Sequence, residues 1–483
     1  MDAATIQNIV KQVLAEMNAN GSTSANGSAG GPAILARPSS RPGVFAEAEQ
    51  AIEAANEAQK KLTRLGYAAR KEAIQIIKQM CADRAEEWGK LELAETKVGR
   101  LDHKIEKLHG ISGLPGAEWL SPYGMSGDHG ISLEEQAPFG TVAAISPVTH
   151  SIPTIASNAV SMIAAGNSLV VNAHPGGAKC AATGVAAFNE ALEAKLGLRN
   201  LITIIEEPSL ESFDALIKSS GIDLICVTGG PGVVKAAMAS GKRAICAGPG
   251  NPPVLVEQSA DLAKAARDII AGASYDNNLL CIGEKQVFVV DSVFDQFLRE
   301  LERAGAMRLN DSQLQRLTDV AFTYKADGGG CSHPVLNRKL VGADATTLAQ
   351  EAGTSAPSGT DLLFAVTDAG HPFVEEEQMM PMLPIVRVRD VEEGIALCKE
   401  TEHNYRHSAI CHSRDIGVLT AMGRALNCTL FVKNGPSFAG LGMGGEGYLN
   451  FTIATTTGEG IVTPATFTRK RRCVMVDNLN IVG

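Results

Sequence analysis

Short apolar strands alternate with longer helical segments along most of the chain, and this alternation restricts the possible folds more than any other feature. The predicted strands are rich in valine and isoleucine and span residues 140–145, 168–172, 201–205, 224–228, 253–256 and 285–290. Because these strands have no polar face, we expect helices to cover them on both sides, as in a parallel sheet between two helical layers. We therefore predict an α/β fold whose ligands bind at the carboxyl ends of the strands.

Composition excludes several classes of protein. The 483 residues are 45% hydrophobic and 20% charged, which is typical of a soluble globular enzyme with two or three domains. A net charge of −10 argues against a general nucleic-acid binder, and the only dense basic run, Arg469–Arg472, is expected to be a solvated or anion-facing edge. No apolar stretch approaches the ~18 residues that a membrane span requires.

Cysteine and histidine usage indicates a reduced chain without a metal site. The ten cysteines contain no CxxC pair, so we predict a cytoplasmic chain rather than a disulfide framework. The ten histidines lack HExxH or any other metal-ligand spacing, and we therefore predict no metal.

The first 17 residues form a separate predicted element. An apolar stripe at helical spacing runs through Ile6, Ile9, Val10, Val13, Leu14 and Met17. Residues 18–43 are rich in glycine, serine and alanine, which predicts a flexible tether. Because an isolated helix this short is marginally stable in water, its stripe is expected to dock on a partner; docking on the chain's own body is the alternative.

Cys281 is the first candidate catalytic residue. It follows Asn277 and Asn278, whose side-chain amides can hydrogen-bond sharp backbone turns, and it precedes the predicted strand at 285–290. This arrangement presents a thiol at the mouth of a sheet, where its thiolate can act as a nucleophile. A nucleophilic cysteine without a hydrolytic base nearby suggests a thioester that is passed to another thiol.

Three turns at strand ends predict a cofactor crevice. The segments 146–153, 174–177 and 228–232 each follow a predicted strand, and each can open a helix whose exposed amides favour phosphate. Residues 440–447 (GLGMGGEG) are similar to a dinucleotide fingerprint, but no strand precedes them and no helical pattern follows. We therefore predict a flexible active-site loop there.

Seven segments together resemble the aldehyde dehydrogenase family, and most closely its coenzyme-A-acylating branch, over residues 44–475. They read SPVTHSIP, AHPGGAK, VTGGPGVV, CAGPGNPPVLVE, NNLLCIGEK, EEEQMMPMLP and MGGEGYLNFTIATTTGEG. The tethered helix resembles the encapsulation peptide of enzymes packed into bacterial microcompartments. The resemblance implies oxidation of propionaldehyde or acetaldehyde to its acyl-CoA with NAD and coenzyme A. A hydrolytic aldehyde dehydrogenase and a non-catalytic microcompartment scaffold are the alternatives.

The resemblance also implies an aldehyde dehydrogenase fold with a Rossmann-like cofactor domain, an α/β catalytic domain and a small oligomerisation element. The expected parts are a targeting helix (1–17), a linker (18–43), an NAD-binding domain (44–245) with a turn-rich hairpin (113–135), a catalytic domain with Cys281 (246–440), and a return to the cofactor domain with an oligomerisation strand (441–483). The implied assembly is a homo-oligomer, either a dimer or a tetramer, encapsulated through a shell protein that binds residues 1–17.

The resemblance assigns three catalytic candidates. Cys281 is the nucleophile, and its backbone amide donates to the oxyanion. The family's second donor is an asparagine, but that position holds His150 here, with Asn158 as the alternative donor and helix capping as the non-catalytic alternative for His150. The glutamate that activates water in hydrolytic relatives has no counterpart in 245–251, so coenzyme A becomes the natural acyl acceptor.

The implied cofactor-binding residues are Thr149, His174, Pro175, Gly176, Thr228, Gly229, Gly230, Gly248 and Glu377. Residues 228–230 match the family's pyrophosphate turn. Glu377 matches a glutamate that holds the nicotinamide ribose, although the acidic run around it, taken alone, would be a solvated surface. His174 stands where hydrolytic relatives have a lysine near the adenine ribose, so NADP is not excluded, and NAD is preferred.

Overall fold

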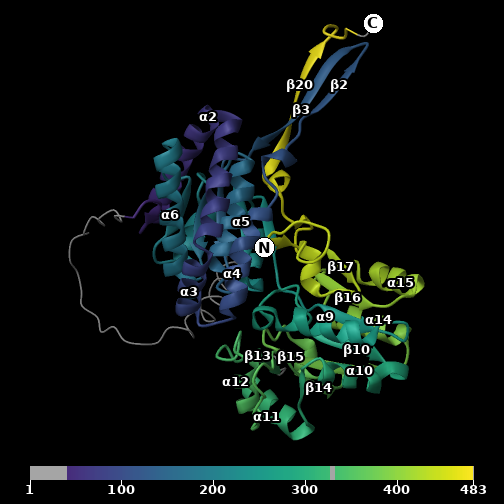
Figure 1. Ribbon diagram of the computed structural model, residues 1–483. Helices are drawn as coiled ribbons and strands as arrows, with labels where there is room; N and C mark the ends of the chain where they lie inside the picture. The colour runs from purple at the N-terminus through teal and green to yellow at the C-terminus, as the bar shows by residue number, and fades with distance from the viewer. Residues whose placement is uncertain (1–40, 327–331, 482–483) are drawn as a thin grey trace, which may run out of the picture. The chain divides into compact units, whose positions relative to one another are not determined.

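The chain folds into two compact units. A computed structural model describes residues 41–326 and 332–481, so the predicted helix over 1–17 and nearly all of the linker over 18–43 lie outside the described residues. The first unit contains the chain up to Glu95, then Lys107–Gly248 and the segment from Asn450 onward. The second unit contains Thr96–Glu106 and Pro249–Leu449. Figure 1 gives the labels of the elements.

A parallel sheet of six strands forms the centre of the first unit. Its order is β1-β6-β5-β4-β7-β8. The strands are β1 (Val44–Phe45), β4 (Thr141–Ser146), β5 (Ser168–Ala173), β6 (Ile202–Ile205), β7 (Leu224–Thr228) and β8 (Ala244–Ala247). The predicted strands of this region are confirmed, while β1, which has only two residues, and β8 were not predicted. The strand order reverses beside β4, and doubly wound sheets bind ligands at such a point.

Helices cover both faces of this sheet, as the apolar strands predict. On β4, Ala143 and Ile145 belong to a core cluster with α2, α7 and α8, while the alternate residues Val142 and Ala144 are buried on the face that α5 contacts. The helices are α2 (Ala48–Asp83), α3 (Ala85–Thr96), α4 (Leu101–Gly110), α5 (Ser151–Ala164), α6 (Ala178–Leu196), α7 (Leu210–Lys218) and α8 (Pro231–Ala239). Short 3₁₀ turns lie at Ile111–Gly113, Ala117–Trp119, Pro175–Gly177 and Pro464–Phe467.

A kink divides the long helix α2. Gly66 has φ 79° and ψ −161°, values that are not helical and that glycine adopts without a steric penalty. The predicted helical region over 44–108 is therefore broken into the two halves of α2, then α3 and α4.

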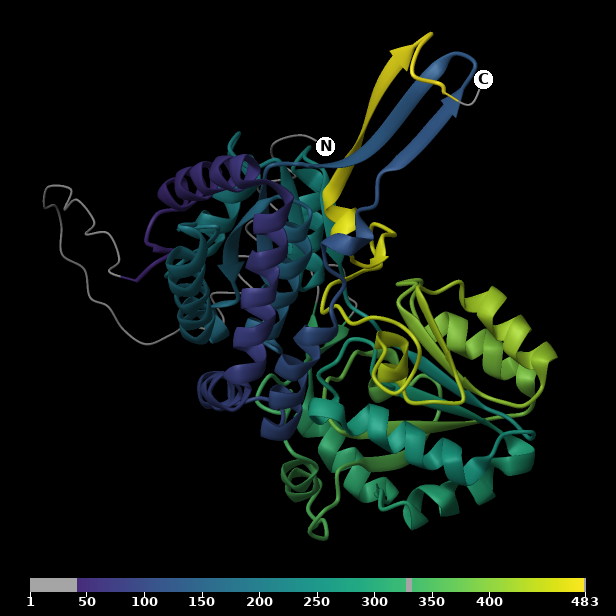
Figure 2. The ribbon, with the colours of Figure 1, turned by 45° about the horizontal axis from the view of Figure 1, so that its top comes forward.

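A three-stranded antiparallel arm belongs to the first unit. The predicted hairpin is confirmed as β2 (Tyr123–Gly127) and β3 (Gly130–Pro138), and β20 (Thr468–Val476) pairs with β3 along its whole length. The arm projects beyond the helices of its own unit in both ribbon views (Figures 1 and 2). The basic run at Arg469–Arg472 lies on β20, where Lys470 and Arg472 form ion pairs with Glu134. This run is thus a solvated edge that faces an anionic side chain.

A second parallel sheet, of seven strands, forms the centre of the second unit. Its order is β11-β14-β15-β10-β9-β16-β17. The strands are β9 (Pro253–Val256), β10 (Gln286–Val290), β11 (Met307–Arg308), β14 (Leu363–Thr367), β15 (Met382–Val388), β16 (Ser408–His412) and β17 (Leu430–Lys433). The predicted strands at 253–256 and 285–290 are neighbours in this sheet, separate from the sheet of the first unit.

The faces of this second sheet are also buried. On β10, Val287 and Val289 pack into a cluster with α9 and α10, while Phe288 and Val290 pack into another with α14 and α15. The helices are α9 (Leu262–Ser274), α10 (Asp291–Arg303), α11 (Asp311–Ala321), α12 (Ala345–Glu351), α13 (Pro372–Glu375), α14 (Val391–Thr401) and α15 (Ile416–Leu426). This unit also contains an antiparallel hairpin of β12 (Phe322–Ala326) and β13 (Ser332–Leu336). The first unit contains a short antiparallel pair, β18 (Ile453–Ala454) and β19 (Gly460–Ile461).

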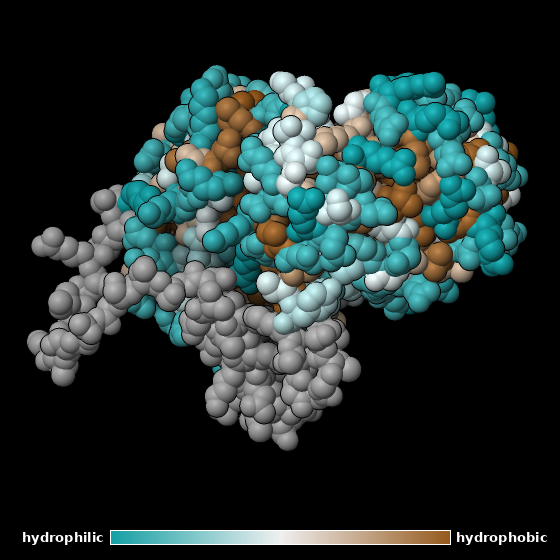
Figure 3. Space-filling view, turned by 90° about the horizontal axis from the view of Figure 1, so that it is seen from below, coloured by the Kyte–Doolittle hydropathy of each residue, from teal (hydrophilic) through white to brown (hydrophobic). Residues whose placement is uncertain are grey.

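The surface has the mixed character that the composition predicts. On the face shown in Figure 3, hydrophilic residues surround small hydrophobic patches. Within residues 41–326 and 332–481, none of the helices combines the length and the apolar character that a membrane crossing requires.

Candidate functional site

The loop that carries Cys281 has an unusual backbone. It leads from α9 through a short 3₁₀ turn (Tyr275–Asn278) to β10. Three consecutive residues of this turn have positive φ: Asp276 at 48°, Asn277 at 55° and Asn278 at 63°. Aspartate and asparagine tolerate this left-handed region better than other non-glycine residues. The sharp turn predicted before Cys281 is confirmed.

The side chains of the same three residues hold the loop against three other segments. Asp276 Oδ1 accepts the Arg100 amide at 2.7 Å. Asn277 Nδ2 donates to the Gly342 carbonyl at 2.9 Å and to Asp344 Oδ1 at 2.8 Å, and Asn278 Nδ2 donates to the Glu284 carbonyl at 3.0 Å. These bonds fix the backbone that precedes the nucleophile.

Cys281 itself is half-buried. The pKa of its thiol is raised to about 12: burial and then the Glu377 carboxylate raise it, while the Lys285 ammonium and the amides of Cys281 and Ile282 partly offset the rise. The thiol is therefore protonated in the unliganded protein at neutral pH. The two amides lie close enough to the sulfur to stabilise a thiolate once it forms.

Four segments of the second unit meet around Cys281, and all of them precede their strands. A Cβ placed on Gly250 would lie 2.7 Å from the Cys281 carbonyl oxygen and 2.8 Å from His407 Cγ, so only glycine fits there. The Gly250 amide lies near the Glu377 carboxylate and favours its charged form. Gly250, Cys281, Glu377 and His407 come before β9, β10, β15 and β16, which means that this cluster lies at the amino ends of the strands. Ligand binding at the carboxyl ends of the strands, the general expectation for such sheets, stays a prediction, and the Cys281 cluster lies at the opposite end of this one.

Burial determines the charge states around the thiol. It raises the pKa of Glu377, and the Lys285 ammonium and the Gly250 amide partly offset that rise. Burial and the Lys285 charge lower the pKa of His407 to about 3, so its imidazole is neutral. His407 Nδ1 lies 2.8 Å from Ser408 Oγ.

Two fully buried ionisable residues of the same loop were missed in the sequence. Glu284 accepts hydrogen bonds from the Ser437 amide at 2.8 Å and from Ser437 Oγ at 2.7 Å, and burial raises the pKa of its carboxyl group to about 7. Lys285 is also fully buried. No local signal in the sequence marks them, because charged residues at the start of a strand are usually solvated.

In the first unit, His150 lies between the carboxyl end of β4 and the start of α5. It is 5% exposed, its Nε2 is 3.4 Å from Thr149 Oγ1, and its ring lies against Phe451 with centroids 5.6 Å apart. The residue occupies the N-cap position of α5, but its side chain makes no capping bond. Helix capping by the imidazole, the non-catalytic alternative, is therefore wrong.

Asn158, in the middle of α5, is linked by hydrogen bonds through Thr452 to Thr228 of the predicted pyrophosphate turn. Its Oδ1 accepts Thr452 Oγ1 at 3.0 Å, and Thr452 Oγ1 is 2.8 Å from Thr228 Oγ1 at the end of β7. The side chain is 1% exposed, and its Nδ2 has no hydrogen-bond partner within the described part of the chain. The structure thus brings Asn158 and Thr228 together through a threonine that the sequence did not single out.

Carboxylates of α3 occupy two of the three helix N-termini proposed for phosphate. Glu92 accepts the Ile152 amide of α5 at 3.0 Å. Glu95 accepts the Lys179 amide of α6 at 2.9 Å and the Cys180 amide as well. The expectation that each turn leaves its helix amides available for phosphate is wrong for these two.

The third helix N-terminus, that of α8, is built differently. Its N-cap is Gly230, with no side-chain cap, and a Cβ on Gly230 would meet nothing within 4 Å. The Gly229 amide donates to the Ala247 carbonyl at 3.3 Å and Pro231 has no N–H, so the amides left for an anion in this turn are those of Gly230, Gly232 and Val233. At the end of β5, His174 Nδ1 accepts the Gly176 amide at 3.0 Å, so this imidazole caps its own turn beside Pro175.

A carboxylate that the sequence reasoning missed lies near the end of β8. Glu459 accepts a hydrogen bond from Thr457 Oγ1. Thr457 Oγ1 in turn accepts a hydrogen bond from the Cys246 amide at 2.9 Å. The half-buried Glu459 follows the glycine-rich turn of the TTTGEG segment. Next to it, a Cβ on Gly248 would lie 2.6 Å from Thr456 Oγ1.

The glycine-rich segment at 440–447 is a loop in the structure. It follows a 3₁₀ turn (Ser437–Leu441), Gly442 and Gly444 have φ of 76° and 79°, and no helix begins after them. The prediction that it is not a dinucleotide fingerprint is confirmed.

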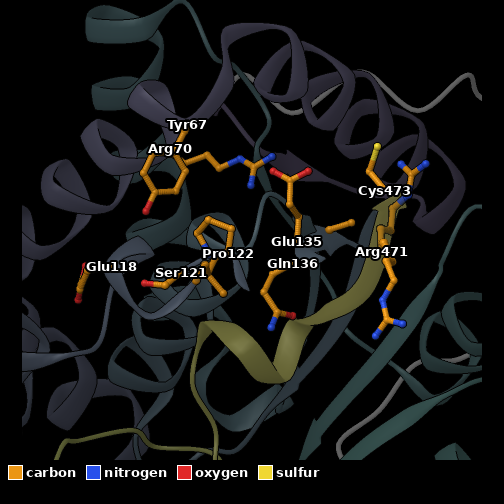
Figure 4. A pocket seen from close by; sticks show the side chains of 12 residues that line it. Tyr67, Arg70, Glu118, Ser121, Pro122, Glu135, Gln136, Arg471 and Cys473 are labelled. Carbon is orange, nitrogen blue, oxygen red and sulfur yellow. The ribbon is translucent and has the colours of Figure 1, made fainter. Parts of the chain in front are cut away.

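A cavity of about 860 Å³ lies at the base of the arm, apart from every predicted site residue of its unit. Figure 4 shows Tyr67 and Arg70 on one side of it and Arg471 and Cys473 on the other, with the guanidinium of Arg70 directed toward the carboxylate of Glu135. Across the described ranges, no group of three or more histidine, cysteine, aspartate or glutamate residues is arranged to hold a metal ion.

A family model and several known proteins match this chain. The model of the aldehyde dehydrogenase family matches residues 43–447. The acetaldehyde dehydrogenase (acetylating) EutE of Salmonella typhimurium is 43% identical over 442 residues, which cover 91% of this chain and 94% of that protein.

Two solved structures are similar in both sequence and fold. A propionaldehyde dehydrogenase of Rhodopseudomonas palustris, with bound CoA and an acylated cysteine, aligns with a TM-score of 0.87 and 40% identity over 91% of this chain and 99% of that one. A propionaldehyde dehydrogenase from the fucose utilisation bacterial microcompartment of Clostridium phytofermentans aligns with a TM-score of 0.87 and 39% identity over 91% of this chain and 100% of that one.

Proposed function

Because the chain belongs to the aldehyde dehydrogenase family, we propose that it oxidises a short aliphatic aldehyde, propionaldehyde or acetaldehyde, to its acyl-CoA with NAD and coenzyme A. The observation that carries this proposal is the Cys281 loop, which holds a half-buried thiol beside two backbone amides on an anchored left-handed turn. The acylated cysteine of the Rhodopseudomonas palustris relative supports a thioester on this residue.

The proposed reaction begins when the Cys281 thiolate attacks the aldehyde carbonyl and forms a thiohemiacetal. The Cys281 amide donates to the resulting oxyanion, and His150 and Asn158 are the candidates for the second donor. Loss of hydride from the former carbonyl carbon leaves a thioester on Cys281. The thiol of coenzyme A then attacks that thioester, so that acyl-CoA departs and the Cys281 sulfur is released.

The residues of the first unit fit a dinucleotide at one place. The uncapped N-terminus of α8, with open space at Gly230, suits the pyrophosphate, and Thr149, His174–Gly176 and Gly248 are the other proposed contacts. In the second unit, Glu377 is the proposed partner of the nicotinamide ribose hydroxyls. When bound, NAD accepts the hydride.

Hydrolysis of the thioester is the second candidate reaction, and one observation favours it. The segment 245–251, where hydrolytic relatives carry the water-activating glutamate, has no carboxylate of its own. The carboxylate of Glu459, however, lies near the end of β8, close to this segment. If water were the acyl acceptor, Glu459 would be the candidate base. The acyl acceptor therefore has to be measured directly.

The first prediction concerns that acceptor. Wild-type protein with propionaldehyde and NAD is expected to form NADH continuously only when coenzyme A is present, and Cys281→Ala is expected to lose at least 10³-fold of kcat because the nucleophile is gone. Absorbance at 340 nm follows NADH, and chromatography identifies acyl-CoA. Equal turnover without coenzyme A, lost in Glu459→Gln, would move the function to hydrolysis. A protein without any burst of NADH would instead be a scaffold.

The second prediction concerns the pyrophosphate site. Gly230→Asp places a carboxylate at the N-cap of α8, where it occupies the free amides and repels phosphate. The Kd for NAD, measured by calorimetry, is expected to rise at least 10-fold, while the unfolding temperature stays the same or rises. Gly230→Asn caps the helix without charge and is the matched control, with a smaller expected loss. An unchanged Kd in Gly230→Asp would remove this turn from the cofactor site.

We further propose that residues 1–17 bind a microcompartment shell protein and that the enzyme works inside the shell. The apolar stripe of this segment and its tether support the proposal, as does the microcompartment origin of the Clostridium phytofermentans relative. The short tether would let the enzyme body remain free while its first residues are bound.

The third prediction tests this targeting role. Deletion of residues 1–17 is expected to leave kcat and KM within twofold of wild type, because none of the proposed catalytic residues lies there. Co-sedimentation with assembled shells is expected to be lost. A fluorescent protein fused to residues 1–43 is the converse control and should sediment with shells. Loss of turnover with retained sedimentation would contradict the proposal.

We also propose that the arm joins copies of this chain into a dimer or tetramer. Residues paired across strands point to the same side of the sheet, so Leu133, Cys473 and Met475 share one side while Met125, Val474 and Val476 share the other. Val474 is 58% exposed and Val476 is 61% exposed. An arm with apolar side chains on both sides is suited to burial against another copy.

The fourth prediction follows from those two sides. The double substitution Val474→Glu with Met475→Glu places a charge on each side of the arm and is expected to lower the molar mass measured by light scattering to that of a smaller assembly. Ile416→Glu, at an apolar residue of α15 that is 78% exposed, is the control and should leave the mass unchanged. An unaltered mass in the double variant would place the subunit interface elsewhere.

A further inference from the structure

We propose that Lys285 is a positioning residue for the thiol chemistry of Cys281. Its buried ammonium holds the inner side of the nucleophile loop, keeps the Cys281 amide directed toward the sulfur, and places a positive charge beneath the thiolate. This inference rests on the proposed reaction, in which Cys281 is the nucleophile.

Within the described part of the chain, the ammonium of Lys285 donates only to the loop that carries Cys281, where it has three acceptors. Its Nζ donates to the Asn278 carbonyl at 2.7 Å, to Asn278 Oδ1, and to the Leu280 carbonyl at 3.2 Å. An ammonium has three donors, so these three bonds use all of them. The side chain is fully buried, which makes each bond costly to lose.

The Leu280 carbonyl accepts two hydrogen bonds, from the Gly283 amide at 3.0 Å and from Lys285 Nζ at 3.2 Å, and together they determine the direction of the next amide. In a trans peptide the carbonyl oxygen and the following N–H point in opposite directions. The two bonds draw the Leu280 carbonyl inward, so the Cys281 N–H points outward, and this amide does lie near the Cys281 sulfur. In the proposed reaction, the oxyanion forms on the carbon atom that is bonded to the Cys281 sulfur. A Cys281 N–H that points outward has the direction needed to donate to this oxyanion.

Neighbouring segments hold Lys285 in this place. The Gln378 side chain donates to the Lys285 carbonyl at 2.8 Å, and Asn278 Nδ2 donates to the Glu284 carbonyl. Asn278 therefore contacts the lysine segment through its amide nitrogen and the ammonium through its two oxygens. The loop before Cys281 and the first residues of β10 form one hydrogen-bonded unit around the ammonium.

Lys285 also contributes charge. The titratable groups that face it are Cys281 and Glu284 on its own loop, Glu377 before β15 and His407 before β16. Burial lowers the pKa of Lys285, while Glu377, Cys281 and Glu284 counteract that effect. The positive charge in turn lowers the pKa of the Cys281 thiol, and His407 adds no charge because burial keeps it neutral.

The ammonium of Lys285 loses its charge when it deprotonates. The resulting pH dependence distinguishes an electrostatic effect on Cys281 from structural support of the loop alone. Below the pKa of Lys285 the ammonium favours the Cys281 thiolate, and above that pKa the neutral amine does not. The advantage of wild type over a neutral variant should therefore be largest at low pH and disappear as pH rises. Loss of structural support alone would reduce reactivity by the same factor at every pH.

The experiment measures alkylation of Cys281 by iodoacetamide from pH 6 to pH 10, with the modified peptide quantified by mass spectrometry. K285Q is expected to react about 10-fold more slowly than wild type at pH 6.5 and at nearly the wild-type rate at pH 10. Its single-turnover burst of NADH is expected to fall 10²–10³-fold at neutral pH, as when an oxyanion donor is lost. K104Q, at another buried lysine of the second unit, is the matched control and should follow the wild-type pH profile.

K285R keeps the proposal testable if K285Q does not fold. Arginine stays charged over this range, so K285R is expected to react faster than wild type above pH 9. Parallel pH profiles for wild type and either variant would overturn the proposal. Coenzyme-A-dependent turnover by wild type is measured alongside, because alkylation reports on the thiol whether or not the acyl acceptor is coenzyme A.

Discussion

The left-handed turn at Asp276–Asn278 is the constraint on which the catalytic half of the molecule depends. Holding three non-glycine residues there costs about 1 kcal/mol or more for each. This conformational cost is offset by hydrogen bonds between their side chains and the segments around Arg100, Gly342 and Glu284. The geometry of the turn before Cys281 therefore depends on those three segments being in place.

The candidate site residues of the two units lie at opposite ends of their sheets. In the first unit, Thr149 and His174 follow strands and Thr228 is the last residue of one, so all three lie where helices begin. In the second, Gly250, Cys281, Glu377 and His407 precede strands, where irregular loops approach each other closely enough that only glycine fits at 250. Amides at helix ends suit an anionic cofactor, and a packed cluster of loops suits control of a single thiol's ionisation. The different local geometry at the two sheet ends thus accounts for the different role proposed for each unit.

The sequence predicted the parallel α/β fold, the arm hairpin and the sharp turn before Cys281, because strand composition, turn residues and asparagine chemistry are local signals. Strand composition alone did not divide the strands between two sheets, since pairing partners are chosen by tertiary packing; that division was implied by the family resemblance, which places residues 44–245 and 246–440 in separate domains. The occupation of the α5 and α6 N-termini by Glu92 and Glu95 was also missed, because those contacts join residues 60 and 85 positions apart. Lys285, Glu284 and Glu459 were missed for a related reason: their burial or hydrogen bonding becomes visible only in three dimensions.

The carboxylates of α3 have a consequence for how a ligand can be positioned. A doubly wound sheet offers several positive helix ends along one edge, and a symmetric diphosphate could settle at any of them in either direction. Here Glu92 and Glu95 occupy the ends of α5 and α6, Ser209 caps α7 (Leu210–Lys218), and the end of α8 has no side-chain cap. A dinucleotide whose diphosphate binds at the end of α8 would therefore have one position along the edge of the sheet. The protein's own side chains would set that position by occupying the competing helix ends.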